Sequence, residues 1–137
     1  MKVFFDTNVL VDVLALRVPF FTDSQKAIDL AGFGQIDAFT SASVIKDIHY
    51  IISNRYRNAG DALDLISELL VVVHLADTTA QDVFNAIKSG NVDFEDAIIS
   101  ETAAREFADV IVTRNKSDFM KSSVPVLLPS ELVEKFK

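Results

Sequence analysis

A short apolar run that stops abruptly at polar residues constrains this chain more than any other feature. The run Val3–Phe5 has high strand propensity, and Asp6, Thr7 and Asn8 follow it directly. An apolar run this short, bounded by a polar break, is typical of a fully buried strand. In open α/β sheets, ligands bind beyond the carboxyl ends of the strands. The pattern predicts Asp6 at the mouth of a site, with Thr7 or Asn8 capping the next helix; a plain strand-to-helix turn is the alternative.

Length and composition bound the class of protein. The chain has 137 residues, half of them hydrophobic, so we expect one domain over residues 1–137 with a sizeable core. It has no cysteine, which excludes disulfides and thiolate metal ligands. No run of about 18 apolar residues and no secretory signal is visible, so we expect a soluble, cytoplasmic protein that does not engage a membrane.

The charge balance limits how the protein can meet nucleic acid. Twenty acids stand against 13 lysines and arginines, a formal net charge of −7. Such a chain does not hold nucleic acid by bulk electrostatics. Clustered carboxylates around divalent cations still allow it, because bound cations reverse the local field.

Strand-like and helical segments alternate along the whole chain. Strands are expected at 3–5, 33–39, 71–75, 110–112 and 124–128. Helices are expected at 9–16, 22–32, from 41 onward, at 62–70, 80–89 and 93–107, and from 130 to the end. This alternation predicts a three-layer α/β/α sandwich with a central parallel sheet of four to five strands. The continuous apolar character of 3–5 and 110–112 places both in the interior of the sheet.

Several later acids are placed so that they can join Asp6. Asp47 lies in the helix opened by Ser41, and Asp93 and Asp96 lie three apart at a helix start, on one face. The segment 113–119 follows a strand directly and carries Asn115 and Asp118. Because the carboxyl ends of parallel strands share one edge, these segments can converge there.

Converging carboxylates predict a metal. Three or four of them without counter-ions repel by several kcal/mol in a shielded site. Oxygen-only ligands suit Mg²⁺ or Mn²⁺, and such an ion can activate water for attack on phosphorus.

Four motifs in order resemble one family. They are Asp-Thr-Asn at 6–8, an acid at 47, Asp-Ala-Ile-Ile at 96–99, and Thr-Arg-Asn-Lys-Ser-Asp-Phe at 113–119. Together they resemble the PIN-domain family over essentially the whole chain. The family consists of small metal-dependent ribonucleases, many of them toxins of bacterial and archaeal toxin–antitoxin pairs. The resemblance implies a PIN-like fold, an endoribonuclease using Mg²⁺ or Mn²⁺, an RNA substrate, a possible antitoxin partner and a homodimer.

The resemblance also assigns roles to the acids and to Asn115. Asp6 and Asp96 match the first and third family acids and are the principal expected metal ligands. Asp47 stands where the family most often has Glu, so it would hold the metal directly or through water. Asn115 stands where many members have a fourth Asp; it would position the attacking water, with Asp118 in partial compensation.

Other residues of the site have competing interpretations. Asn8 would steady the first acid, Thr113 would lie at the site floor, and Arg114 or Lys116 would engage the substrate phosphate. Lys46, next to Asp47, would add positive charge near the site. Asp93 is either a metal ligand or only a helix N-cap, and Asp118 either a site residue or a turn-former. Asp12 and the acids at 61, 64 and 68 are expected at the surface. Arg55 and Arg57 around Tyr56 either hold a phosphate and a base or form a solvated helix end.

Two other enzyme classes fit less well. A haloacid-dehalogenase-type phosphotransferase needs a second Asp two residues after the first, where this chain has Asn8. A receiver domain needs an acid pair at its first strand, which is missing here. The remaining rival is a PIN-like module that binds RNA or protein without cutting, which the residues at 47 and 115 favour.

Overall fold

A five-stranded, fully parallel sheet forms the centre of the protein. The computed structural model describes residues 1–56 and 59–137. The strands are β1 (Lys2–Phe5), β2 (Asp37–Ser41), β3 (His74–Ala76), β4 (Val110–Val112) and β5 (Val126–Leu127). Their order across the sheet is β3-β2-β1-β4-β5. The predicted parallel α/β/α sandwich is confirmed.

Strand β1 lies at the centre because its residues tolerate complete burial. Val3, Phe4 and Phe5 are fully buried, as are most of the residues of β4 beside them. The register pairs Val3 with Val110 on one side and with Ala38 on the other. The predicted interior position of both apolar runs is therefore confirmed.

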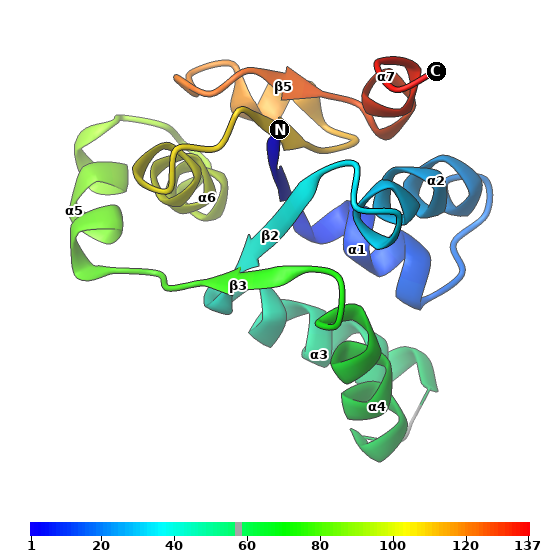
Figure 1. Cartoon of the computed structure of the whole chain (residues 1–137). Helices are drawn as coiled ribbons and strands as arrows, with labels where there is room; N and C mark the ends of the chain where they lie inside the picture. The colour runs from blue at the N-terminus through cyan, green and yellow to red at the C-terminus, as the bar shows by residue number, and fades with distance from the viewer. Residues whose placement is uncertain (57–58) are drawn as a thin grey trace.

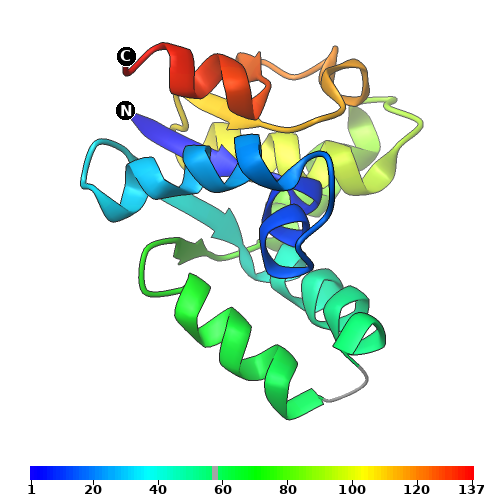
Figure 2. The ribbon, with the colours of Figure 1, turned by 90° about the vertical axis from the view of Figure 1, so that its right-hand side faces the viewer.

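Helices cover both faces of the sheet. Figure 1 shows α5 (Ala80–Lys88) and α6 (Phe94–Arg105) on one side, and α1 (Thr7–Leu14), α2 (Phe21–Gly32) and α7 (Pro129–Glu134) on the other. The pair α3 (Ala42–Tyr56) and α4 (Ala59–Leu69) extends beyond the β2–β3 end, as Figure 2 shows most clearly. A 3₁₀ turn, η1 (Lys116–Phe119), follows β4. No helix in the described part of the chain combines the length and apolarity that a membrane crossing requires.

The third strand differs from its prediction. Residues 71–73 do not form a strand but close the end of α4, where Val71 N–H donates to the carbonyl of Glu68 and Val73 N–H to that of Leu69. The strand begins only at His74, which pairs with Phe39 of β2. Backbone bonds at the helix end therefore override the strand propensity of the three valines. The second strand is displaced in the same direction, to 37–41 instead of 33–39.

Two predicted helix starts also need correction. Asp6 itself caps α1, since its carboxylate accepts the Thr7 N–H at 2.7 Å; neither Thr7 nor Asn8 is the cap. Ser41 does not open α3 but ends β2. As a result, the carboxyl end of β2 and the start of α3 are directly continuous.

Candidate metal centre

Strands β1 and β4 bring the first acid and Thr113 side by side. Phe5 pairs with Val112, and the Asp6 N–H continues the ladder by donating to the Val112 carbonyl at 2.9 Å. The residue that follows each strand is polar: Asp6 follows β1 and Thr113 follows β4. Both therefore lie at the carboxyl edge of the sheet. Residues 6 and 113, more than 100 positions apart, are fixed by the register of two buried strands.

The Thr113 hydroxyl orients the Asp6 carboxylate. It accepts from Asn8 Nδ2 at 3.2 Å and from the Asn115 N–H at 3.1 Å. With both of those donors satisfied, its own proton goes to Asp6 Oδ2 at 2.8 Å. The structure thus places buried Thr113 beneath Asp6, with Asn8 steadying the acid through it. Roles in catalysis for Thr113 and Asn8 remain predictions.

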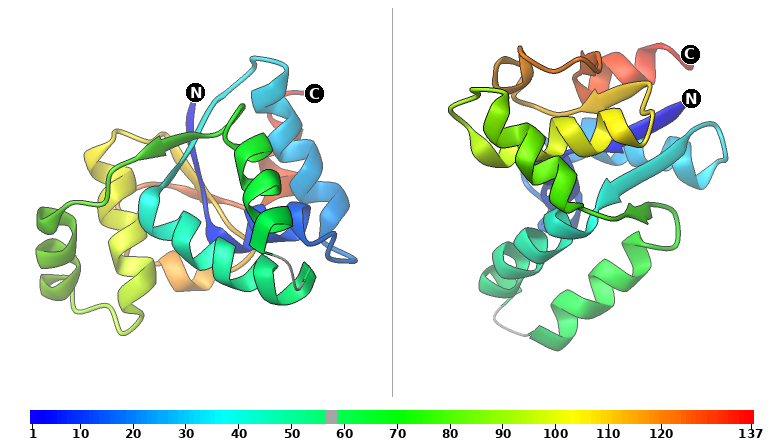
Figure 3. Two further views of the ribbon diagram at one scale, coloured as in Figure 1. Left: turned by 90° about the horizontal axis from the view of Figure 1, so that it is seen from below. Right: turned by 90° about the vertical axis from the view of Figure 1, so that its left-hand side faces the viewer.

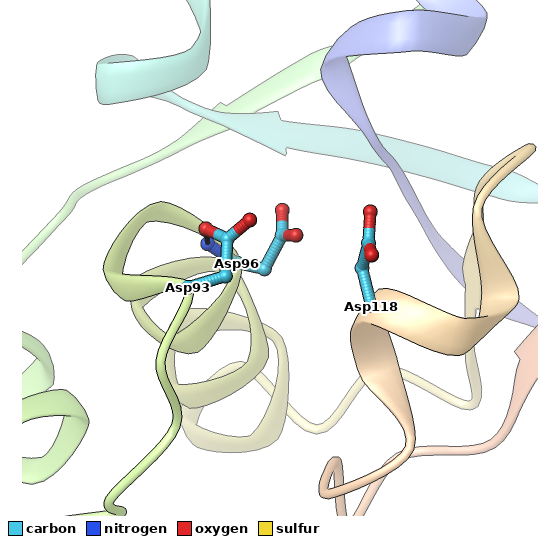
Figure 4. Close-up of side chains that lie close together, drawn as sticks. All are labelled: Asp93, Asp96 and Asp118. Atoms are coloured by element: carbon cyan, nitrogen blue, oxygen red, sulfur yellow. Dashed lines mark hydrogen bonds between the residues drawn. The ribbon is translucent and has the colours of Figure 1, made fainter.

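Three acids meet across the gap between α6 and η1. Asp93, Asp96 and Asp118 offer carboxylate oxygens that all lie within 4.8 Å of one another. Figure 4 shows Asp93 and Asp96 at the first turn of α6, opposite Asp118 on η1. Asp93 is also the N-cap, since its Oδ1 accepts the Asp96 N–H at 3.1 Å. The N-cap interpretation of Asp93 is therefore confirmed, and its role as a metal ligand stays a prediction.

The remaining acids line the same cleft but lie outside that trio. The cleft has a volume of about 920 Å³ and is lined by Asp6, Asp47 and Asn115 together with the three clustered acids. Asp47 projects from α3 and is exposed, so it faces the cleft from the opposite wall. The structure thus groups Asp118 with Asp93 and Asp96 and leaves Asp47 at the border of the cleft.

Burial and mutual repulsion disfavour the charged form of Asp96. The pKa of Asp96 is raised to about 8, and burial is the largest cause of this rise. A hydrogen bond with the Asp93 side chain and the negative charges of Asp6 and Asp118 add to the effect. A perturbed acid in a cleft is a candidate functional residue.

Asp6 is perturbed in the same direction by a different balance. Burial raises its pKa, while the hydrogen bonds from Thr113 and Thr7 partly oppose that rise. The charges of Asp118 and Asp93 raise it further. Asp6 at the end of β1 and the acids of α6 and η1 therefore act on one another electrostatically across the cleft.

The donor set fits a hard divalent cation. All candidate ligands are carboxylate or amide oxygens, which Mg²⁺ and Mn²⁺ prefer. Two oxygens bound to one Mg²⁺ lie at most about 4.2 Å apart, twice the metal–oxygen distance. The oxygens of the trio lie within 4.8 Å of one another, so at most a small side-chain adjustment brings them into that range.

Arg114 has a partner other than the substrate phosphate predicted for it. Its Nε donates to Asp12 Oδ2 at 2.7 Å and its terminal nitrogen to Oδ1 at 3.1 Å. The guanidinium also lies 3.8 Å from the centre of the Phe20 ring. The predicted surface position of Asp12 is wrong: it is fully buried, and Ser24 Oγ also donates to it.

The other predicted cations are also engaged elsewhere. Lys116 pairs with Glu131 at 3.1 Å and does not line the cleft. Tyr56 is half-buried and donates its hydroxyl to the Leu14 carbonyl, so it is not a free stacking platform. Arg57, the other flank of that predicted group, lies outside the described residues.

Sequence reasoning found one of the two cations that line the cleft. Arg17, between α1 and α2, and Lys46 on α3 both border it, and both are exposed. The sequence predicts Lys46 near the site, because it precedes Asp47 on the helix that opens at the sheet edge. Arg17 carries no such signal, since a loop brings it there.

Comparison with known proteins identifies the family. The PIN domain family matches residues 2–117, which include every acid that lines the cleft except Asp118. The chain belongs to the PIN-domain family. Ribonuclease VapC1 of Aquifex aeolicus (strain VF5) is 28% identical over 140 residues, covering 98% of this chain and 95% of that protein.

Solved structures agree on the PIN fold. VapBC-1 from nontypeable Haemophilus influenzae matches with a TM-score of 0.72 and 15% identity, covering 95% of this chain and 99% of that one. VapBC2 from Rickettsia felis, bound to a promoter DNA fragment, matches with a TM-score of 0.70 and 17% identity, covering 93% of this chain and 98% of that one. A toxin–antitoxin complex from Klebsiella pneumoniae matches with a TM-score of 0.68 and 20% identity, covering 94% of this chain and 98% of that one. At these identities the likeness establishes the fold.

Proposed function

We propose that this PIN domain is a metal-dependent endoribonuclease that hydrolyses RNA phosphodiester bonds. The observation that carries the proposal is the convergence of Asp93, Asp96 and Asp118 in one cleft with Asp6, at the carboxyl edge of the sheet. The ribonuclease named among its relatives supports the same reaction.

The metal centre would be built mainly by Asp6, Asp96 and the neighbouring acids. Asp96, Asp93 and Asp118 would hold Mg²⁺ or Mn²⁺, with Asp6 beside them and Asp47 acting through water. When bound, such an ion lowers the pKa of attached water and stabilises negative charge developing on phosphate oxygens.

The chain's own groups orient and admit the substrate. Thr113 fixes Asp6 in one rotamer, so the acid needs no reorganisation when a phosphate arrives. The Asn115 amide lines the cleft and can orient a water by hydrogen bonding. Arg17 and Lys46 supply the local positive charge that an acidic protein needs to admit RNA.

We further propose an antitoxin as the protein partner. The similar structures from three bacteria include VapBC pairs and a toxin–antitoxin complex. This chain would act in the cytoplasm, where its RNA is, and as a homodimer in its free form. Sedimentation of the purified chain, alone and with the product of a neighbouring gene, tests both assemblies.

A labelled-oligonucleotide assay tests the activity. Wild type should cut single-stranded RNA with Mg²⁺ or Mn²⁺ and stop on addition of EDTA. Asp6→Asn should lower the rate at least about a hundredfold, the scale for losing one electrostatic stabiliser. Arg17→Gln, which leaves the acids in place, is the milder control. Equal cutting by Asp6→Asn would identify a contaminating nuclease.

A non-catalytic binding module is the second candidate. Asn115 in place of an acid and the exposed position of Asp47 favour it. If wild type binds RNA or a protein partner but never cuts RNA with either metal, this second function replaces the first.

A further inference from the structure

The cleft has two walls of different character. Most of its acids lie on α6 and η1, together with Asp6. The facing wall is α3, where Ser43, Asp47, Tyr50 and Asn54 follow one another at intervals of three or four residues along one face. This face leads from the acidic centre toward the far end of the helix, and Figure 3 shows α3 extending away from the sheet.

Tyr50 occupies an unusual position for a large aromatic side chain. It lines the cleft yet is 72% exposed, and within the described residues its side chain forms no hydrogen bond, ion pair or ring contact. The other tyrosine, Tyr56, is half-buried, and its hydroxyl donates to the Leu14 carbonyl. The apolar surface of an exposed ring is hydrated, which is unfavourable. Stacking of a planar ligand on the ring would remove that surface from water and so be favourable.

Positive charge accompanies this ring. Lys46 stands one helical turn before Tyr50, and Arg17 borders the same cleft from the α1–α2 loop. Within the described residues neither side chain forms an ion pair, whereas Arg114 and Lys116 do. The backbone of Arg17 is nevertheless fixed, since its N–H donates to the Asp12 carbonyl at 3.0 Å.

We propose that Tyr50 is a base-stacking subsite for single-stranded RNA, with the adjoining phosphates held by Lys46 and Arg17. The proposal rests on the ribonuclease function above and deepens it. A metal at the acidic wall would hold the scissile phosphate, while the strand continues along α3. Stacking on one ring is tolerant of sequence but requires an unpaired base, because every base has a π-face that pairing and stacking in a duplex would cover.

The ring is tested by binding in the Asp6→Asn background, which leaves the probe intact. The probe is a fluorescein-labelled 12-nucleotide oligouridylate with Mg²⁺, followed by anisotropy. Tyr50→Ala should raise Kd roughly tenfold to a hundredfold, the range found when one stacking ring is lost. Tyr50→Phe should bind like the parent. Phe33→Ala is the matched control, because Phe33 is equally exposed but lies away from the cleft.

Probes with a single abasic nucleotide locate the stacked base. One position should weaken binding in the parent and have no effect in Tyr50→Ala. Lys46→Ala and Arg17→Ala should each flatten the slope of log K against log salt by about 0.7–1, while Lys88→Ala should not. Equal affinity of Tyr50→Ala and the parent, or equal binding of a 12-base-pair duplex, would overturn the subsite.

The two levels of the proposal fail differently. If wild type cuts RNA and Tyr50→Ala binds as the parent does, only the stacking subsite is lost. If wild type neither cuts nor binds RNA, both fall, and the α3 face belongs to a protein partner.

Discussion

Fully or half-buried carboxylates occur in this protein in two contrasting regions. Asp12 and Asp82 are almost fully buried, and each is held by a guanidinium, from Arg114 and Arg105 respectively. Asp6 and Asp96 are held by hydroxyl, amide and carboxyl groups and, within the described residues, form no ion pair. In the first region an arginine of the protein neutralises each carboxylate. In the second region the negative charge has no such partner, and an external cation can neutralise it.

The pKa directions express the same contrast. Burial alone would raise the pKa of Asp82, but hydrogen bonds from Arg105, from the Thr79 N–H and from Thr102 lower it overall. Asp96 lacks a cation, and its pKa rises to about 8. Asp96, at the start of α6, thus has no cationic partner among the described residues, whereas Arg105, at the end of the same helix, compensates Asp82 of α5. Such a difference between two acids distinguishes a candidate functional acid from a structural one.

The largest expected effect comes from breaking the neutralised region. Arg114→Met leaves Asp12 buried without its cation and should lower the free energy of unfolding by roughly 3–5 kcal/mol. Urea denaturation without metal measures it. Arg17→Met, which removes an exposed arginine without an ion pair, should stay within about 0.5 kcal/mol. A loss of less than 1 kcal/mol for Arg114→Met would mean that the pair contributes little.

A second, opposite effect is expected in the uncompensated region. Asp96→Asn should stabilise the metal-free protein at pH 9 by at least about 1 kcal/mol, because one pKa unit corresponds to about 1.4 kcal/mol. The raised pKa means that the folded state binds more protons than the unfolded state between pH 4 and 8. Wild-type stability should therefore fall as pH rises through that window, and the variant should show a smaller slope.

Mn²⁺ provides the control for this second prediction. At a concentration 100 times its Kd it should stabilise wild type by about 2.7 kcal/mol and the variant by less. If Asp96→Asn lowers metal-free stability at pH 9, Asp96 is a structural acid and the two regions are alike.

The smallest effect should follow from adding a carboxylate. Asn115→Asp places a hard anionic ligand at the edge of the centre and should tighten Mn²⁺ binding severalfold and raise cleavage. Calorimetric titration with Mn²⁺ measures the affinity. Ser117→Asp, on the neighbouring exposed residue of η1, is a matched control for added charge alone. If both variants bind Mn²⁺ more tightly by the same factor, the added negative charge explains the gain and no direct ligand at position 115 is needed.

The sequence predicted the uncompensated region better than the neutralised one. Asp6 and Asp96 follow or open regular elements, so local patterns place them at the sheet edge. The pairing of Asp12 with Arg114 joins residues 102 apart, and only the packing of α1 against the loop after β4 shows it. A signal was present, because Asp12 interrupts the apolar run of α1, where a buried acid needs a partner.

The sequence predicted correctly the strands whose position depends on burial. It predicted wrongly the strand whose start depends on backbone hydrogen bonds. The apolar runs of β1 and β4 can only be interior, and they are. Val71 to Val73 look like a strand in isolation, but they close α4, and the pairing with β2 starts at His74. Arg17 and Tyr50 were not foreseen, because a loop and a helix direction bring them to the cleft.

The sheet order has a consequence for a chain emerging from the ribosome. The central strand β1 is made first, yet its neighbour β4 spans residues 110–112 and Asp118 follows later still. At roughly 5–20 residues per second, about 6–22 s of synthesis separates Asp6 from Asp118. The carboxylates cannot assemble during that interval. A nascent chain therefore has no complete centre until Asp118 has been made, and a product that ends before Asp118 never has one.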